Sequence, residues 1–339
     1  MQRFLGLRHD AVAAQAPSAY PGGEHTRWYK SGIDPKDSSG PYACQRLRNA
    51  RFTPVIKAEF QISHEDHLFA IGSCFARGIE KSLKARGFKV ESAACDFDRF
   101  SIVGDKKVTA LGFTNKYTTY SMLNELSWAL DPAALFPESS LVDLDEKRCI
   151  DPHINPTLEV VDRAGTLERR SIIHEVSRRI RDCRVVFVTL GLVEVWYDTH
   201  AGVYLNTTPT RDMMRLFPKR YEPMTSNYPQ NLANMEKLHA LLSAHGHPDL
   251  RIVVTTSPVP LQATFTGNDI VVANTYSKST LRAVAQDFAA GHDNVQYFPS
   301  YEAVMNSDRS AAWDDDLRHV QGPMTNHVMD VFMRSFVAG

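Results

Sequence analysis

A serine and a cysteine follow one another after an apolar run, Leu68 to Ile71, that ends in Gly72. Such a run is typical of a buried strand, and apolar residues then recur at helical spacing. Ser73 and Cys74 are therefore expected where a strand ends and a helix begins, which is where open α/β sheets bind ligands. Free backbone N–H groups and the helix dipole stabilise an anion there. The chemistry predicted is nucleophilic attack by one of two neighbouring side chains.

Alternating strands and helices must position this stretch. Strands are predicted at 68–71, 87–90, 184–190, 251–256 and 295–298. Helices are predicted at 75–86, 114–130, 167–182, 231–245, 275–290 and 324–336. Hairpins are predicted at 195–205 and within an insertion at about 131–165. The order predicts a doubly wound, mostly parallel α/β sheet with right-handed crossovers.

The chain divides into an arm and a body. Residues 1–58 are broken by proline and glycine, and we expect a largely irregular N-terminal arm whose Trp28, Tyr29 and Tyr42 pack on the body. Residues 59–339 are expected to form the α/β domain.

Composition excludes several functions. Lysine and arginine total 38 against 39 acidic residues, a net charge of −1 without a basic block, so a nucleic-acid partner is not expected. No run reaches transmembrane length, and no secretory apolar segment follows Met1. The five cysteines form no CxxC pair, which favours a reduced, cytoplasmic protein.

No cofactor or metal is predicted. The short histidine pairs at 64–67 and 245–247 have no further ligand at metal-binding spacing. Phosphate-binding loops and dinucleotide glycine motifs are also missing from the sequence.

Residues 72–76 read Gly-Ser-Cys-Phe-Ala, the motif that names the GSCFA family, and the chain resembles this family from about Phe60 to its C-terminus. Matching segments follow in the expected order at 189–196, 256–259, 274–278 and 316–319. The family's fold is similar to that of the SGNH/GDSL hydrolases. The resemblance implies a three-layer α/β/α fold with a flavodoxin-like strand order.

The resemblance also implies a catalytic triad. In SGNH enzymes the reactive serine is the second residue after the glycine of the first block, which here is Cys74, with Ser73 in reserve. The other interpretation is a small cysteine buried at a tight turn. Asp316 and His319 have the Asp-x-x-His spacing of the last SGNH block, so His319 would be the general base and Asp316 would accept its Nδ1 proton. Either of the two aspartates before Asp316 could replace it.

Three groups are candidate oxyanion donors: the backbone N–H of Cys74, the Gly191 loop and the side chain of Asn115. SGNH enzymes use an asparagine of their third block, and this chain has Val193 there. Asn115 could equally be a turn or capping residue.

Five further residues are expected around the substrate. Glu194 and Trp196 follow the family pattern and would shape the pocket, although Glu194 could instead form a structural salt bridge. Ser257, Asn274 and Lys278 would line it, with Lys278 holding a carboxylate or phosphate unless it lies on a solvated helix face.

Two classes of function follow. The first is an acyl-transfer enzyme that hydrolyses an O-acyl ester, and the resemblance suggests a carbohydrate as the acyl carrier. Acyl-CoA-dependent O-acyl transfer to a polysaccharide or glycan is the alternative, with acyl-CoA as co-substrate. The second class is a non-catalytic binding protein on the same fold, favoured by Val193. The sequence does not define the oligomeric state.

Overall fold

The computed structural model describes residues 23–93, 112, 114–155 and 159–337. Its centre is a five-stranded parallel sheet in the order β10-β9-β5-β1-β2. The strands are β1 (His67–Gly72), β2 (Lys89–Val90), β5 (Val185–Leu190), β9 (Arg251–Thr256) and β10 (Val295–Tyr297). Counted along the chain, this is the flavodoxin-like order 2-1-3-4-5. The predicted doubly wound sheet is confirmed.

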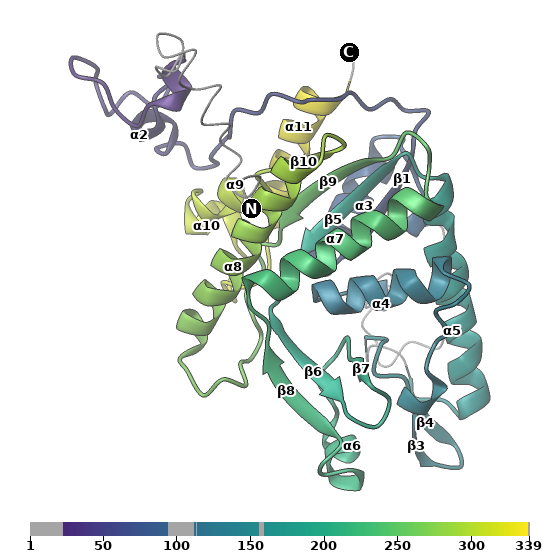
Figure 1. The fold of residues 1–339 in the computed structure, drawn as a ribbon. Coiled ribbons are helices and arrows are strands. Elements are labelled where there is room, and N and C mark those ends of the chain that lie inside the picture. The colour runs from purple at the N-terminus through teal and green to yellow at the C-terminus, as the bar shows by residue number, and fades with distance from the viewer. Residues whose placement is uncertain (1–22, 94–111, 113, 156–158, 338–339) are drawn as a thin grey trace.

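Helices cover both faces of this sheet (Figure 1). One layer contains α4 (Thr119–Leu130), α5 (Arg163–Arg178), α7 (Tyr228–His245) and α8 (Ile270–Gly291). The other contains α3 (Cys74–Ala85), α9 (Ser300–Met305), α10 (Arg309–Ala312) and α11 (Gly322–Phe336). Successive strand residues point to opposite faces, so Phe69 and Ile71 enter the first core while Leu68 and Ala70 enter the second. The result is the expected three-layer α/β/α fold.

Smaller elements extend the domain at one end (Figure 1). The predicted insertion contains the hairpin β3 (Val142–Asp145) and β4 (Arg148–Ile150). A three-stranded antiparallel sheet has the order β7-β6-β8, with β6 (Glu194–Asp198) paired to both β7 (Val203–Tyr204) and β8 (Tyr221–Thr225). The sequence did not predict β8 because Pro223 interrupts it, and β8 is an edge strand, where proline is tolerated. The remaining short elements are η1 (Glu24–Thr26), α2 (Ala43–Arg46), η2 (Glu91–Ala93), η4 (Glu138–Ser140), η5 (Arg179–Asp182) and α6 (Arg211–Leu216).

The described part of the arm contains only η1 and α2 up to residue 58. Trp28 and Tyr29 are exposed, so the expectation that they pack on the body is wrong. Tyr42 is buried, and its hydroxyl contacts Glu24 of the arm itself.

The helix predicted to start at Thr114 begins instead at Thr119. The Thr118 side chain accepts a hydrogen bond from the backbone N–H of Ser121 and so caps the helix. The preceding residues are held against the sheet, because the backbone N–H of Lys116 donates to the carbonyl of Gly72 at 2.9 Å. Most of the predicted 95–112 loop, with Cys95, lies outside the described residues.

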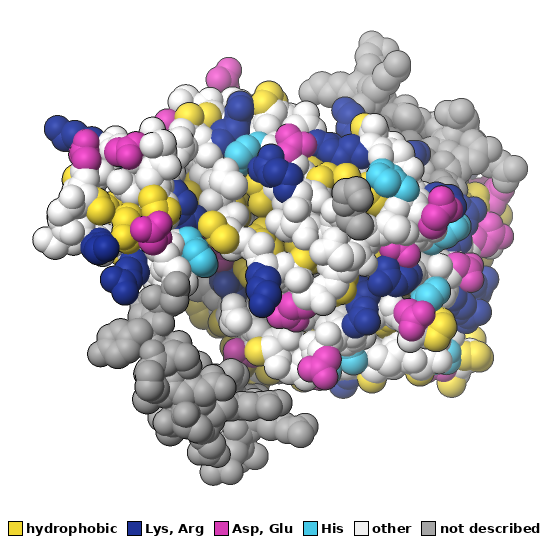
Figure 2. All heavy atoms as spheres, turned by 90° about the horizontal axis from the view of Figure 1, so that it is seen from above, with side chains coloured by type: hydrophobic (Ala, Val, Ile, Leu, Met, Phe, Trp, Pro, Cys, Tyr) yellow, Lys and Arg dark blue, Asp and Glu magenta, His cyan; other side chains and the backbone are white. Residues whose placement is uncertain are grey.

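The surface carries charges of both signs. Figure 2 shows acidic and basic side chains interspersed over the face seen from above. Of the helices in the described ranges, none combines the length and apolar character needed to cross a bilayer.

Candidate active site

Three neighbouring strands end at the same edge of the sheet. β1, β5 and β9 are parallel and in adjacent register, so Ser73, Gly191 and Ser257 come together there. The Ser73 hydroxyl donates to Oγ of Ser257 at 3.3 Å. The strand between them, β5, is followed by Gly191, which has no side chain to separate the two hydroxyls. A Cβ atom at Gly191 would lie 3.6 Å from that of Ser73 and 2.7 Å from the carbonyl oxygen of Tyr117.

Steric contacts explain why glycine occupies position 72. Gly72 has a φ of +152°, a region that favours glycine. A Cβ atom there would lie 2.7 Å from both the carbonyl oxygen and the Cβ atom of Thr189 on β5. The turn from β1 into α3 therefore requires glycine, and Ser73 becomes the residue that precedes the helix.

Cys74 is the first residue of α3 and is exposed, whereas Ser73 is buried. The interpretation of Cys74 as a buried turn residue is therefore wrong. Within the described chain, the backbone N–H of Cys74 has no recorded acceptor. The side-chain amide of Asn115 donates to its Sγ at 3.5 Å. The thiol thus lies at a helix start beside two hydrogen-bond donors.

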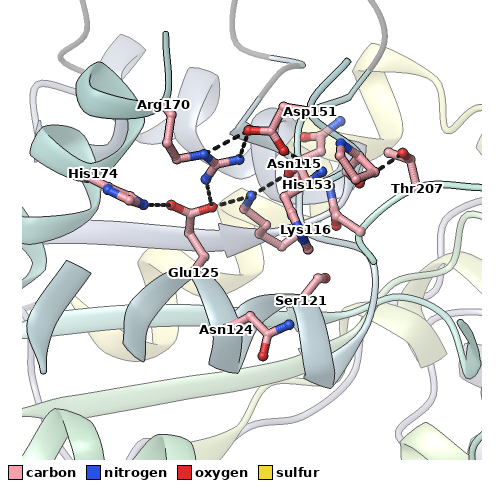
Figure 3. Close-up of polar contacts among 12 residues, drawn as sticks. Asn115, Lys116, Ser121, Asn124, Glu125, Asp151, His153, Arg170, His174 and Thr207 are labelled. Atoms are coloured by element: carbon pink, nitrogen blue, oxygen red, sulfur yellow. Dashed lines mark hydrogen bonds and ion pairs between the residues drawn. The ribbon is translucent and has the colours of Figure 1, made fainter. Parts of the chain in front are cut away.

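Asn115 belongs to a buried segment, 115–117, that is fixed on both sides. Asn206 donates to the carbonyl of Asn115 at 2.8 Å and accepts from the backbone N–H of Tyr117 at 3.1 Å. Lys116 points the other way, into a buried cluster of charges (Figure 3). Asn115 and Asn155 both donate to the Tyr117 hydroxyl, at 3.3 Å and 2.6 Å. Burial, and then the nearby Cys74, raise the pKa of Tyr117 to about 12.

A cavity of about 320 Å³ opens beside Cys74. This volume is at the lower end of the range for ligand pockets, about 300–1,000 Å³. Its lining includes Ser73, Cys74, Tyr117, Asn155, Gly191, Leu192, Glu194, Trp196, Leu205, Asn206, Thr207, Pro260, Gln262, Phe265 and Arg318.

Glu194 and Trp196, both predicted at the pocket, do line it. The carboxylate of Glu194 accepts from the Thr264 hydroxyl at 2.7 Å and from the backbone N–H of Phe265 at 2.8 Å. Trp196 contacts the Phe265 ring edge-to-face at a centroid distance of 5.0 Å. Both residues therefore fix the loop that carries Phe265.

Ser257, Asn274 and Lys278 are not among the described residues that line the cavity, but each holds a loop that does. Ser257 accepts from the backbone N–H of Val259 at 3.3 Å, and Asn274 from that of Leu261 at 3.2 Å. Lys278 is fully buried, not solvated, and its ammonium donates to the carbonyl of Gly191 at 2.8 Å. Burial, and then the charge of Arg318, lower the pKa of Lys278 to about 7.

Asp316 and His319 lie in a turn between α10 and α11 and contact each other as predicted. His319 Nδ1 is 2.5 Å from Oδ2 of Asp316, and its backbone N–H donates to Oδ1. The backbone N–H groups of His319 and Arg318, and then the His319 ring, hold the pKa of Asp316 well below its usual range.

The predicted base, His319, does not contact the predicted nucleophile, Cys74, through any described hydrogen bond. Nε2 of His319 lies 3.2 Å from Nη1 of Arg318, and it is Arg318, not His319, that lines the cavity. Among the described contacts no hydrogen bond connects His319 to Cys74. The structure therefore forms two pairs of the predicted site residues, Asp316 with His319 and Asn115 with Cys74, and no described hydrogen bond links one pair to the other.

Among the lining residues that sequence reasoning missed are Tyr117, Asn155, Asn206 and Arg318. Three of them are polar loop residues whose neighbours come from distant segments, so nothing local marked them. The sequence did contain a signal for Arg318, because this residue lies inside the Asp-x-x-His stretch at 316–319.

No group of three histidine, cysteine or acidic side chains in the described ranges is arranged to hold a metal ion. The cysteines in those ranges, at 44, 74, 149 and 183, are free thiols.

These features define a class: doubly wound α/β proteins with a thiol where the first strand turns into a helix. Residues 67–332 match the GSCFA family, which covers most of the chain, and the protein belongs to that family.

Comparison with curated proteins finds no match. Among solved structures, the chain is similar to a carbohydrate esterase family 2 enzyme with a carbohydrate-binding domain from Corynascus thermopiles (Myceliophthora fergusii). The sequence identity is 12%, the TM-score is 0.34, and the match covers 83% of this chain and 67% of the other.

Proposed function

We propose that this protein is an acyl-transfer enzyme that hydrolyses an O-acyl ester through a thioester on Cys74. One observation carries the proposal. The exposed thiol of Cys74 lies at a helix start within a ligand-sized cavity, with an amide donor of Asn115 3.5 Å from its Sγ. Such a position favours a thiolate and an oxyanion.

The first step forms the thioester. His319 takes the proton of Cys74, and the thiolate attacks the carbonyl carbon of the ester. The negative charge that develops on the carbonyl oxygen is stabilised by the backbone N–H of Cys74 and the side chain of Asn115. The C–O bond then breaks, and the leaving alkoxide takes the proton from His319.

The second step returns the enzyme. His319 removes a proton from water, and the hydroxide attacks the thioester carbon. The C–S bond then breaks, a carboxylic acid is released, and the Cys74 thiolate takes the proton back from His319. A substrate hydroxyl in place of water gives transfer instead of hydrolysis. An acyl-CoA donor enters at the first step, with its thiolate as leaving group.

A carbohydrate as acyl carrier suits the cavity walls. Trp196 and Phe265 offer aromatic surface, and Asn155, Asn206 and Thr207 offer polar atoms nearby. A few polar groups among apolar and aromatic ones are typical of sites for small polar ligands.

A binding protein on the same fold is the second candidate. It is favoured by the contact between Arg318 and Nε2 of His319, because that contact occupies the atom which must accept the thiol proton.

Intact-mass measurement tests the proposal. Wild-type, Cys74→Ala, Ser73→Ala and His319→Ala proteins are exposed briefly to 4-nitrophenyl acetate and, separately, to acetyl-CoA. We expect one acetyl adduct on wild-type protein that is lost with Cys74→Ala, kept with Ser73→Ala and slowed with His319→Ala. The donor that acylates faster separates an esterase from a transferase.

The matched comparison is between the two neighbouring side chains at 73 and 74. An adduct that disappears with Ser73→Ala would move the nucleophile to Ser73. The lack of any site-dependent adduct from either donor would support the binding protein.

A further inference from the structure

Arg318 is held at the cavity by a well-defined turn. The carboxylate of Asp316 accepts hydrogen bonds from the backbone N–H groups of both Arg318 and His319, each at 2.9 Å. The backbone N–H of Asp314 closes the turn on the carbonyl of His319. Leu317, in the middle, has a left-handed φ of +53°. The backbone that carries Arg318 is therefore fixed before any ligand binds.

The guanidinium of Arg318 is not neutralised. Its Nη1 lies 3.2 Å from Nε2 of His319, and an Nε2 atom that accepts this hydrogen bond adds no negative charge to balance the guanidinium. Its Nε is buried and has no hydrogen-bond partner in the described part of the chain, where no carboxylate pairs with it either. After burial, the charge of Arg318 lowers the pKa of Lys278 further, and it opposes part of the rise that burial and Cys74 cause in the pKa of Tyr117. A partly buried cation without a counter-charge is costly.

Among the described lining residues, no acidic side chain forms an ion pair with Arg318. Glu194 and Arg318 are the charged residues among the described lining residues. Both carboxylate oxygens of Glu194 already accept hydrogen bonds, from Thr264 and Phe265. Glu194 keeps its negative charge, but its oxygens are bound to the loop that carries Phe265, so the guanidinium of Arg318 has no paired carboxylate among the described lining residues. One guanidinium matches one carboxylate, to which it can donate two parallel hydrogen bonds.

We propose that Arg318 binds a carboxylate carried by the substrate close to its ester group, and that this contact frees Nε2 of His319 for the proton of Cys74. The first half concerns recognition alone, and the second rests on the proposed function. The carboxylate can belong to the alcohol part, as in an acidic sugar, or to the acyl part, as in the half-ester of a dicarboxylic acid.

Hydrolysis of matched ester pairs tests the proposal. O-acetylated glucuronic acid and its methyl ester place the charge on the alcohol side. The hemisuccinate of 4-nitrophenol and its methyl ester place it on the acyl side. We expect wild-type protein to prefer the acid over its methyl ester in one pair by about 10- to 100-fold in kcat/KM, the range of a charge-assisted hydrogen bond. The pair that shows the preference identifies the source of the carboxylate.

The variants separate recognition from folding. Arg318→Gln is expected to abolish the preference and to raise activity on the neutral methyl ester, because Nε2 of His319 is no longer held. Arg318→Lys is expected to restore part of the preference. Arg309→Gln removes the same charge from an exposed position of α10 and is expected to behave as wild type. Equal activity of wild-type protein on acid and methyl ester in both pairs, or an unchanged preference in Arg318→Gln, overturns the proposal.

A binding measurement does not depend on turnover. Calorimetric titration of O-acetylated glucuronic acid, the succinate half-ester and their methyl esters into Cys74→Ala and Cys74→Ala/Arg318→Gln proteins reports recognition alone. Tighter binding of one acid that requires Arg318 supports recognition even if Cys74 forms no thioester, in which case only the proposed function fails. Equal binding of each acid and its methyl ester overturns the inference on Arg318 and leaves the acylation of Cys74 to its own test.

Discussion

Asn115 supplies a donor that Val193 cannot. The Asn115 amide contacts the Cys74 thiol from a different segment of the chain. This segment is held in place because the backbone N–H of Lys116 donates to the end of β1, and because Asn206 bonds the peptide groups on either side of Lys116. In the proposed mechanism, Asn115 takes the part of the oxyanion donor that the SGNH pattern places at the position of Val193. This position depends on contacts among distant segments, so the sequence could offer Asn115 only as a candidate.

Asn115→Ala is expected to slow acylation of Cys74 by about 100-fold, the usual loss when one oxyanion donor is removed. The rate of adduct formation with 4-nitrophenyl acetate, followed by intact mass, measures it. Asn155→Ala is the matched control, since Asn155 lines the cavity and, like Asn115, donates to the Tyr117 hydroxyl, but has no recorded contact with Sγ. Equal losses in the two variants would show that Asn115 acts only through Tyr117.

At the scale of elements, a buried cluster of charges anchors the 115–117 segment (Figure 3). Glu125 of α4 accepts from Lys116 at 2.6 Å and from Arg170 of α5 at 2.7 Å, and Arg170 also pairs with Asp151. All four side chains are buried. Two cations and two carboxylates balance each other, so removing one partner leaves an uncompensated charge.

Glu125→Gln is expected to lower the free energy of unfolding by about 3–5 kcal/mol, because two buried cations lose their shared carboxylate. Urea unfolding followed by circular dichroism measures the change. Glu65→Gln is the control, since it breaks an exposed ion pair with Lys89, which is worth about 0–1 kcal/mol. A similar, small loss in both variants would mean that water reaches the cluster.

Sequence patterns predicted the elements that bury continuous apolar runs. All five sheet strands, the two hairpins and the long helices follow from such runs or from amphipathic spacing, although helix ends moved by several residues. The errors lie where tertiary contacts override local preference. Lys116 bonds to the end of β1 instead of starting a helix, and β8 pairs at an edge despite Pro223. Arg318 was missed for the same reason, because its importance comes from what it contacts and not from its spacing.

At the scale of the whole molecule, the buried His153 and the partly buried His174 connect this cluster to global stability. Burial lowers the pKa of His153 to about 3 and that of His174 to about 4. An unfolded chain protonates histidine near pH 6.5. Below that pH the unfolded state therefore binds protons that the native state does not, and stability falls as the pH decreases. Glu125 acts in the same direction: burial alone would raise its pKa, but Lys116 and Arg170 lower it, so its contribution is lost in acid.

The free energy of unfolding is thus expected to fall between pH 6 and pH 5 by up to about 1.4 kcal/mol per pH unit for each of the two histidines. His153→Phe removes one group that takes up a proton on unfolding, and it keeps the ring contacts with Trp128 and Phe136. The slope of the variant's free energy of unfolding against pH should therefore be smaller by the equivalent of about one proton. The double variant His153→Phe/His174→Phe should reduce this slope by the equivalent of about two protons. Urea unfolding of the three proteins at pH 7, 6 and 5 measures these slopes. Parallel slopes in all three would show that the histidines take up protons in the native state, and that the cluster around Glu125 accommodates added positive charge.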